Sequence, residues 1–242
     1  MSEGLIIYMH ILSPYAKTVI ATANHLDIPH TERHIDLRKN EHKSEWYLKI
    51  NPNGQVPAIK DGDHTMAESI DIAKYLIESR DKGTPLYPND DAEKREDIDR
   101  ALEISQELGK RTTDVLLNVY WGRILRKTNL TVEERQGFIN KVYETYGKLN
   151  THLEERNTKY FNSNFHPSLA DFHINNLMMS LVEKNIVQLD NYPALKQWLE
   201  LSSQVPALSD VIRRSNAAMK KIRFLVRFVL PMIRCLTCKC CR

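Results

Sequence analysis

Two short segments of the chain place hydroxyl and carboxylate side chains where a helix begins. In the first segment Ser13 directly precedes Pro14, and proline is favoured in the first turn of a helix. That turn leaves backbone N–H groups unpaired and carries partial positive charge, so it stabilises an anion. A hydroxyl group that donates a hydrogen bond to a thiolate favours the ionised thiol further. Ser13 is therefore a candidate for activating a thiol, and simple capping of the helix is the alternative.

The second segment is Glu68-Ser69, which opens a helix predicted over residues 68–79. The N–H groups of a first helical turn can hold a carboxylate. Capping of the helix by both side chains is the alternative, and it is compatible with the same geometry.

The elements that position these segments alternate between strands and helices. Apolar or alternating runs predict four strands: 5–9, 31–37, 56–60 and 64–66. Helical spacing predicts three helices: 14–26, 43–49 and 68–79. The last two strands are joined by an Asp61-Gly62 hairpin turn. The first strand–helix–strand unit implies a parallel pair with a right-handed crossover, and the whole order is thioredoxin-like.

The rest of the chain carries no strand signal after a turn-rich linker over 81–91. Helical patterns cover five segments: 91–125, 132–157, 168–184, 193–204 and 207–218. Capping boxes are predicted at Thr131 with Glu134 and at Ser168 with Asp171. We therefore expect an α/β thioredoxin-like N-terminal domain (1–80), an all-α C-terminal helical domain (92–218) and a C-terminal extension (219–242).

The segment "LKINPNGQVPAIKDGDHTMAESIDIAKYL" (48–76) resembles the cytosolic glutathione transferases. It is similar to their pattern Asn-Pro-x-x-x-Val-Pro-x-Leu…Glu-Ser-x-x-Ile-x-x-Tyr-Leu, and the likeness extends over about residues 3 to 215. The serine-using theta and delta classes fit best, because "EHKSEWYLKINP" and the serine at position 13 are similar to theirs. Where thioredoxin-like redox proteins carry Cys-Pro-Tyr-Cys, this chain has Ser13-Pro14-Tyr15-Ala16.

The resemblance implies that the reactive thiol arrives with glutathione and that Ser13 donates to its sulfur. Tyr8 is the rival donor, as in the alpha, mu and pi classes; otherwise it is a packed strand residue. Val56 is expected to precede a cis Pro57 and to offer its backbone to the cysteinyl part of glutathione. The resemblance assigns the γ-glutamyl carboxylate to Ser69 and the γ-glutamyl ammonium to Glu68.

Further site residues are also carried over from the family. His42 and Gln55 occupy positions that contact the glycine end of glutathione in the serine-using classes. Asp99 is similar to an acidic residue that theta-like dimers offer across their interface. A pocket for the electrophile is expected between the domains, lined by the first two long helices, with three candidate residues: Tyr120, Trp121 and Arg123. Packing of the aromatic pair in the core is the alternative for Tyr120 and Trp121.

The extension over 219–242 differs in composition from the rest of the chain. It holds seven Lys or Arg, no Asp or Glu, and all four cysteines. Its apolar and basic residues predict an amphipathic helix that stops near Pro231. A basic helix followed by acylated cysteines would attach the protein peripherally to a membrane surface. Metal binding by the cysteines and an idle extension are the alternatives.

The composition excludes several classes of function. Without the extension the chain has 27 basic and 31 acidic side chains, which disfavours non-specific nucleic-acid binding. Residues 1–218 hold no cysteine, so neither a disulfide framework nor a dithiol redox reaction is expected. The N-terminus lacks a signal-peptide pattern, and no apolar run reaches the length of a membrane span. We expect a cytoplasmic protein with no metal site in its body.

These features together predict a theta/delta-like glutathione transferase, a detoxification enzyme that conjugates reduced glutathione to small hydrophobic electrophiles. Glutathione is expected as co-substrate with no other cofactor, and the protein is expected to be a homodimer. The alternative is a catalytically silent adaptor or ligand-binding protein of the same fold, attached to a membrane surface. Gly54 and Asp71, which depart from the family pattern, favour that alternative.

Overall fold

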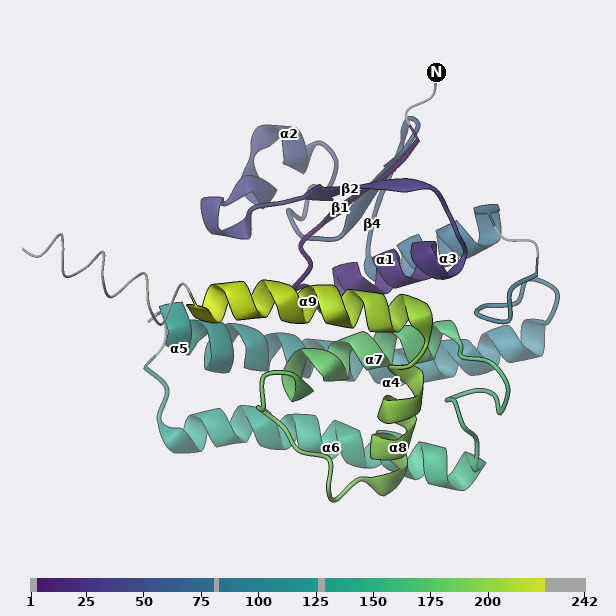
Figure 1. Cartoon of the computed structure of the whole chain (residues 1–242), viewed down its shortest axis with the longest axis vertical. Coiled ribbons are helices and arrows are strands. Elements are labelled where there is room, and N and C mark those ends of the chain that lie inside the picture. Colours follow the sequence, from purple (N-terminus) through teal and green to yellow (C-terminus); the bar gives the residue numbers. More distant parts are fainter. Residues whose placement is uncertain (1–3, 81–82, 126–128, 225–242) are drawn as a thin grey trace, which may run out of the picture.

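The computed structural model describes residues 4–80, 83–125 and 129–224 of the chain, without the side chains of residues 123 and 125. Its four strands form one sheet in the order β2-β1-β3-β4 (Figure 1). Their bounds are Leu5–Met9 for β1, His30–His34 for β2, Ala58–Asp61 for β3 and His64–Ala67 for β4. β1 and β2 run parallel, whereas the other neighbouring pairs are antiparallel. This is the thioredoxin-like sheet that the order of elements predicted.

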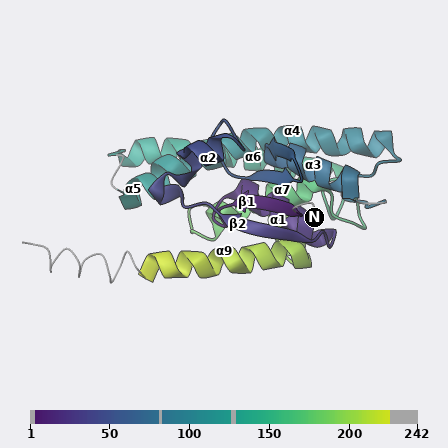
Figure 2. The ribbon, with the colours of Figure 1, turned by 90° about the horizontal axis from the view of Figure 1, so that it is seen from above.

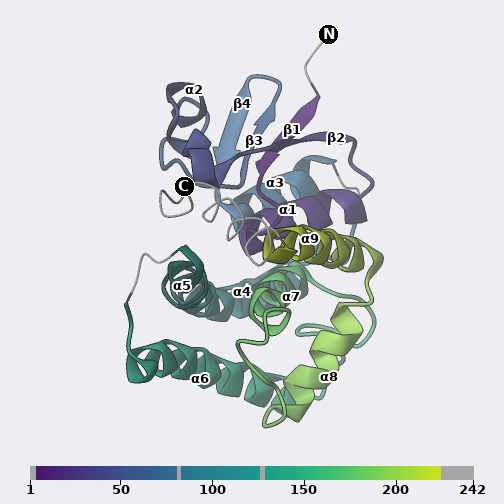
Figure 3. The same ribbon diagram turned by 60° about the vertical axis from the view of Figure 1, so that its left-hand side comes forward.

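Two helices pack against one face of the sheet and a shorter one lies at the other. α1 (Pro14–His25) and α3 (Ser69–Arg80) contact each other and lie between the sheet and the remaining helices (Figure 3). α2 (Glu45–Leu48) follows two 3₁₀ turns and packs on the opposite face through Tyr47. The helix predicted over 43–49 is shorter than expected, because Lys43 ends a 3₁₀ turn and α2 begins only after Ser44.

The second half of the chain is helical, as predicted. Its α-helices within the described residues are α4 (Ala92–Asp114), α5 (Gly122–Leu125), α6 (Val132–Arg156), α7 (Leu169–Val182), α8 (Pro193–Ser202) and α9 (Pro206–Phe224). α7 contacts α1, α4 and α9, and the view from above places α1 and α7 between α4 and α9 (Figure 2). Both predicted capping boxes are present.

Two helix features differ from the sequence prediction. The helix predicted over 91–125 is interrupted by a π-helical segment, Val115–Trp121. α9 runs without a break to Phe224, so the start of the predicted extension continues the last helix of the helical layer. The predicted stop at Pro231 and the four cysteines lie outside the described residues. Among the described helices, none is long and apolar enough to cross a membrane.

A buried histidine lies where α7 packs on α1. His173 is 2% exposed, and its Nδ1 lies 3.2 Å from Oγ1 of the buried Thr18. Its ring also lies beside that of Tyr15, with 5.8 Å between centroids. Burial penalises the imidazolium form, so it lowers the pKa of His173 to about 4.

This burial makes the stability of the protein depend on pH. The unfolded chain takes up a proton at His173 near pH 6.5, whereas the folded chain does so only near its lowered pKa. Stability is therefore lost as the pH falls from 6.5 towards 4, by about 3 kcal/mol from this group. His173→Asn retains a polar group near Thr18 but cannot ionise. In urea unfolding at pH 7 and pH 4, we expect the variant to lose about 3 kcal/mol less than the wild type; equal losses would contradict this assignment.

Candidate functional site

The register of the sheet brings the predicted glutathione residues to one edge. Tyr8 of β1 pairs with Ala58 of β3, and Ala58 pairs with Ala67 of β4. β1 therefore ends, β3 begins and β4 ends at the same edge of the sheet. Ser13 follows β1, Val56 and Pro57 precede β3, and Glu68 and Ser69 follow β4, so all five extend from this edge.

Ser13 is the N-cap of α1. Its backbone is extended, with φ −77° and ψ 121°, and its Oγ accepts a hydrogen bond from the N–H of Ala16 at 3.3 Å. Pro14 occupies the first turn, as predicted. Because the hydroxyl oxygen acts as the acceptor in this cap, the hydroxyl hydrogen is available for another partner. Capping and donation to a bound sulfur are therefore compatible at this position.

The loop before β3 contains the predicted cis bond between Val56 and Pro57. Two side chains hold the residue before it: Tyr47 Oη donates to the carbonyl oxygen of Gln55 at 2.7 Å, and Asn51 Nδ2 donates to the same oxygen at 2.8 Å. Sequence reasoning missed these two supports. Both residues lie in the segment "WYLKIN" (46–51), which is part of the resemblance to the serine-using classes but was assigned no role in binding.

Gly54 and His42 bring the loop before β3 against the turn that precedes α2. Gly54 has φ +58°, and a Cβ there would lie 2.6 Å from the carbonyl oxygen of His42. A larger residue is therefore excluded for reasons of space and backbone conformation. The His42 Nδ1 is buried with no hydrogen-bond partner among the described residues, and burial lowers the pKa of His42. The side chain of Gln55 is exposed.

Glu68 and Ser69 line a cavity of about 660 Å³ that also borders α1 and α4. Glu68 is exposed and has φ +68°, in the left-handed region that non-glycine residues rarely adopt. Its carbonyl oxygen nevertheless accepts the N–H of Ile72 at 2.9 Å, so the helix is continuous from this residue. Ser69 is 6% exposed. Such backbone strain persists only where the surroundings enforce it, and it occurs often at ligand sites.

Tyr15 forms part of the wall of the same cavity, which the sequence did not predict. Its Oη lies 3.0 Å from Oγ1 of Thr113 on α4. A Cβ at Gly109 would lie 2.9 Å from that Oη, so this glycine lets α4 approach the start of α1. Tyr15 thereby joins the start of α1 to the helical layer two residues from Ser13.

Asp99 also borders the cavity, but its carboxylate is engaged within its own chain. Lys74 Nζ lies 2.7 Å from Oδ1, and Tyr87 Oη donates to Oδ2 at 2.9 Å. If Asp99 contacts glutathione across a dimer interface, its carboxylate must therefore interact with glutathione and with Lys74 at the same time. No local pattern could predict this pairing, because Lys74 and Asp99 belong to different helices.

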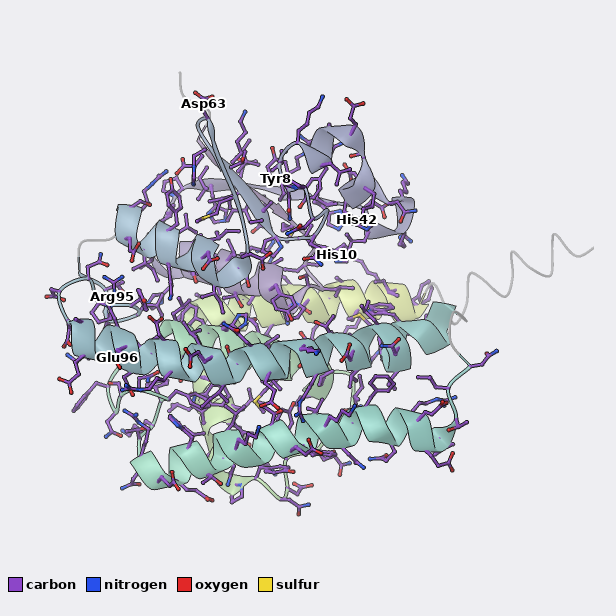
Figure 4. All side chains as sticks on the ribbon, turned by 180° about the vertical axis from the view of Figure 1, so that it is seen from behind. Tyr8, His10, His42, Asp63, Arg95 and Glu96 are labelled. Atoms are coloured by element: carbon purple, nitrogen blue, oxygen red, sulfur yellow. The ribbon has the colours of Figure 1, made fainter. Side chains whose placement is uncertain are left out.

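The ring of Tyr8 packs on the α2 face of the sheet. Tyr8 is 3% exposed and belongs to a small cluster with Ile35, Tyr47 and Ala58. The Arg33 guanidinium lies 5.6 Å from its ring centroid. Figure 4 shows Tyr8 within the sheet layer, close to α2. This position favours the packing interpretation of Tyr8.

Tyr120 and Trp121 end the π-helical segment. Their rings meet edge-on at 5.0 Å, and Lys184 Nζ lies 5.6 Å from the centroid of Tyr120. Both residues are half-buried, and Trp121 also packs against the core. Arg123 follows in α5, but its side chain lies outside the described part of the structure. Within that part, no group of three or more His, Cys, Asp or Glu is arranged to hold a metal ion.

Comparisons with known proteins agree with this geometry. Residues 12–79 match the family model described as glutathione S-transferase, N-terminal domain. The chain is 39% identical to human glutathione S-transferase theta-1 over 87 residues, 36% of either chain. It is 27% identical to a glutathione S-transferase of Hyoscyamus muticus over 217 residues, 86% of this chain and 98% of that one. An epsilon-class glutathione S-transferase structure from housefly, Musca domestica, has a TM-score of 0.75 at 28% identity and covers 90% of this chain and 97% of that one.

Proposed function

The chain belongs to the cytosolic glutathione transferase family, and we propose that it conjugates reduced glutathione to small hydrophobic electrophiles. The observation that carries this proposal is the convergence of Ser13, Val56, Pro57, Glu68 and Ser69 at one edge of the sheet. The family relationship supports glutathione conjugation in general. The serine-type mechanism described next belongs to the proposal.

Binding would begin with the γ-glutamyl end of the peptide. The first turn of α3 offers unpaired N–H groups and the Ser69 hydroxyl to its carboxylate, and Glu68 offers a carboxylate to its ammonium. The backbone of Val56 would pair with the cysteinyl residue, and His42 with Gln55 would contact the glycine end. These contacts would place the thiol at the start of α1.

Chemistry would follow at Ser13. Free thiols have a pKa of about 8.5, so activation at neutral pH requires that the thiolate be favoured. The Ser13 hydroxyl and the first turn of α1 would do this, and the thiol proton would pass to solvent. The thiolate would then form a carbon–sulfur bond with the electrophile, and a group such as halide would leave with the electron pair. Tyr120, Trp121 and Arg123 are proposed to line the electrophile side.

The class, assembly and location of the protein are also part of the proposal. The serine at position 13 favours a theta/delta-like class. The relatives of the chain include plant, insect and theta-1 proteins. A homodimer is proposed on the basis of the resemblance to the cytosolic glutathione transferases. Peripheral membrane attachment through 219–242 stays a prediction, since residues 225–242 lie outside the described ranges.

The test of this function uses the full-length protein. We expect retention on glutathione-agarose and turnover of at least one member of a panel of reactive halides and epoxides. Ser69→Ala should raise the KM for glutathione about tenfold, because it removes one hydrogen bond to a charged group. The kcat should change little. Ser79→Ala is the matched control, because Ser79 lies on the same helix with an exposed side chain bonded to the Tyr75 carbonyl. Retention without turnover of any electrophile would favour the catalytically silent alternative.

A further inference from the structure

We infer that His10 is a positioning residue that shapes the loop before Ser13 and so aims the Ser13 hydroxyl at the bound sulfur. The inference rests on the proposed function, because it assumes that Ser13 is the donor. His10 follows β1 directly, and three residues carry the chain from it to the start of α1: Ile11, Leu12 and Ser13.

His10 accepts two backbone hydrogen bonds from this loop. Its carbonyl oxygen accepts the N–H of Ser13 at 2.8 Å, and its Nδ1 accepts the N–H of Leu12 at 3.3 Å. The second bond resembles those that Asn and Asp side chains make two residues along a chain, which tighten a turn. One residue thus fixes two successive N–H groups, including that of the N-cap itself.

The imidazole is itself held by its neighbours. Its ring lies beside that of His34 at the end of β2, with 4.9 Å between centroids. The backbone on either side is tied down, because the N–H of Ile35 donates to the Met9 carbonyl at 2.8 Å. Figure 4 shows His10 at the border between the sheet layer and the helices beneath it. The ring contact with His34 and the bond from the Leu12 N–H together hold the imidazole with Nδ1 toward the loop.

Nδ1 can accept a hydrogen bond only when it carries no proton, which requires the neutral ring with its hydrogen on Nε2. The groups whose charges act on the His10 ring are His34 on β2, Asp36 after it, and Arg38 in the following 3₁₀ turn. Burial, His34 and Arg38 outweigh Asp36, so the pKa of His10 is lowered to about 4. The acceptor is therefore present throughout the neutral range.

Substitutions of His10 by asparagine, glutamine and leucine can distinguish the role of Nδ1 as an acceptor from simple packing of the ring. Asparagine places an amide oxygen close to where Nδ1 lies, and it has no ionisable group. Glutamine reaches instead towards the position of Nε2, and leucine fills a similar volume without an acceptor. If the acceptor at Nδ1 matters, asparagine should substitute for His10, whereas glutamine and leucine should not.

The experiment compares full-length His10→Asn, His10→Gln, His10→Leu and Ser13→Ala variants with the wild type. We expect His10→Gln and His10→Leu to lower kcat about tenfold and to raise the pKa of the bound glutathione thiol by about one unit, read from ultraviolet absorbance of the thiolate. The KM for glutathione should change little, because Glu68 and Ser69 are untouched. His10→Asn should stay within about twofold of the wild type in both measurements.

Several outcomes would overturn the inference, and they differ from failure of the proposed function. Equal activity of the Asn, Gln and Leu variants, whether high or low, would show that the Nδ1 acceptor is not what matters. If His10→Leu fails to fold, the contrast between Asn and Gln decides the question alone. An unimpaired Ser13→Ala variant would refute the proposed donor, whereas an impaired Ser13→Ala beside an unimpaired His10→Gln would refute only the role of His10.

Discussion

Replacing Ser13 with alanine is expected to lower kcat/KM for glutathione conjugation by about 10- to 100-fold. A hydrogen bond to a charged group contributes about 1.5–3 kcal/mol, and its loss would raise the pKa of the bound thiol by about one to two units. The Ala16 N–H would also lose its capping partner, which costs about 1 kcal/mol of stability. Steady-state kinetics and ultraviolet titration of the bound thiol check the two effects separately.

Tyr8→Phe is the control for this prediction, because it removes the rival hydroxyl and keeps the ring. The Tyr8 ring packs with Ile35, Tyr47 and Ala58, so phenylalanine should preserve the cluster. We expect activity within about twofold of the wild type. A large loss in Tyr8→Phe with little loss in Ser13→Ala would transfer the donor role to Tyr8.

Replacing Asp171 with alanine is expected to lower the free energy of unfolding by about 3–5 kcal/mol. Asp171 is fully buried. Its Oδ1 accepts from the Phe161 N–H at 2.9 Å and from Trp198 Nε1 at 2.7 Å, and its Oδ2 accepts from the N–H and Oγ of Ser168, each at 2.7 Å. Removing the carboxylate would strand several buried donors, and each stranded group costs about 1–3 kcal/mol. Urea unfolding at pH 7 measures the change.

Asp91→Ala is the matched control for Asp171→Ala. Asp91 caps α4, and its Oδ1 accepts from the Lys94 N–H at 3.0 Å at an exposed position. Loss of such a cap costs about 1 kcal/mol. Similar losses in the two variants would show that the buried contacts of Asp171 add little beyond ordinary capping.

Asp171 shows what can be learned from a capping pattern. Ser168 and Asp171 lie three residues apart, and this spacing alone predicted a capping box, because both partners belong to one helical turn. Taken alone, that spacing implies only the cost of losing a cap, about 0.5–2 kcal/mol. The contacts with Phe161 and Trp198 come from distant parts of the chain, so the larger expected cost emerged only from the fold.

The candidate site also contains some features that could be predicted from the sequence and others that depend on the fold. Ser13 and Glu68-Ser69 could be predicted because each is a local motif at the start of a helix, whereas Val56-Pro57 came from the resemblance to the family. Their convergence at one edge depends on strand register, and the supports Tyr47 and Asn51 depend on how the loop at Gln55 folds back. Asp99 was assigned from resemblance, while its pairing with Lys74 requires two helices to meet.

By itself the sequence determined the order of strands and helices, the helix starts at Ser13, Thr131 and Ser168, and the family pattern over 48–76, because these features depend on neighbours within one or two turns. The tertiary structure alone decided which buried groups meet. Long-range packing placed His10 beside His34, set Tyr15 against Gly109 and surrounded Asp171 with donors. Hydrogen bonds and burial between segments far apart in sequence depend on relative positions that no local spacing encodes.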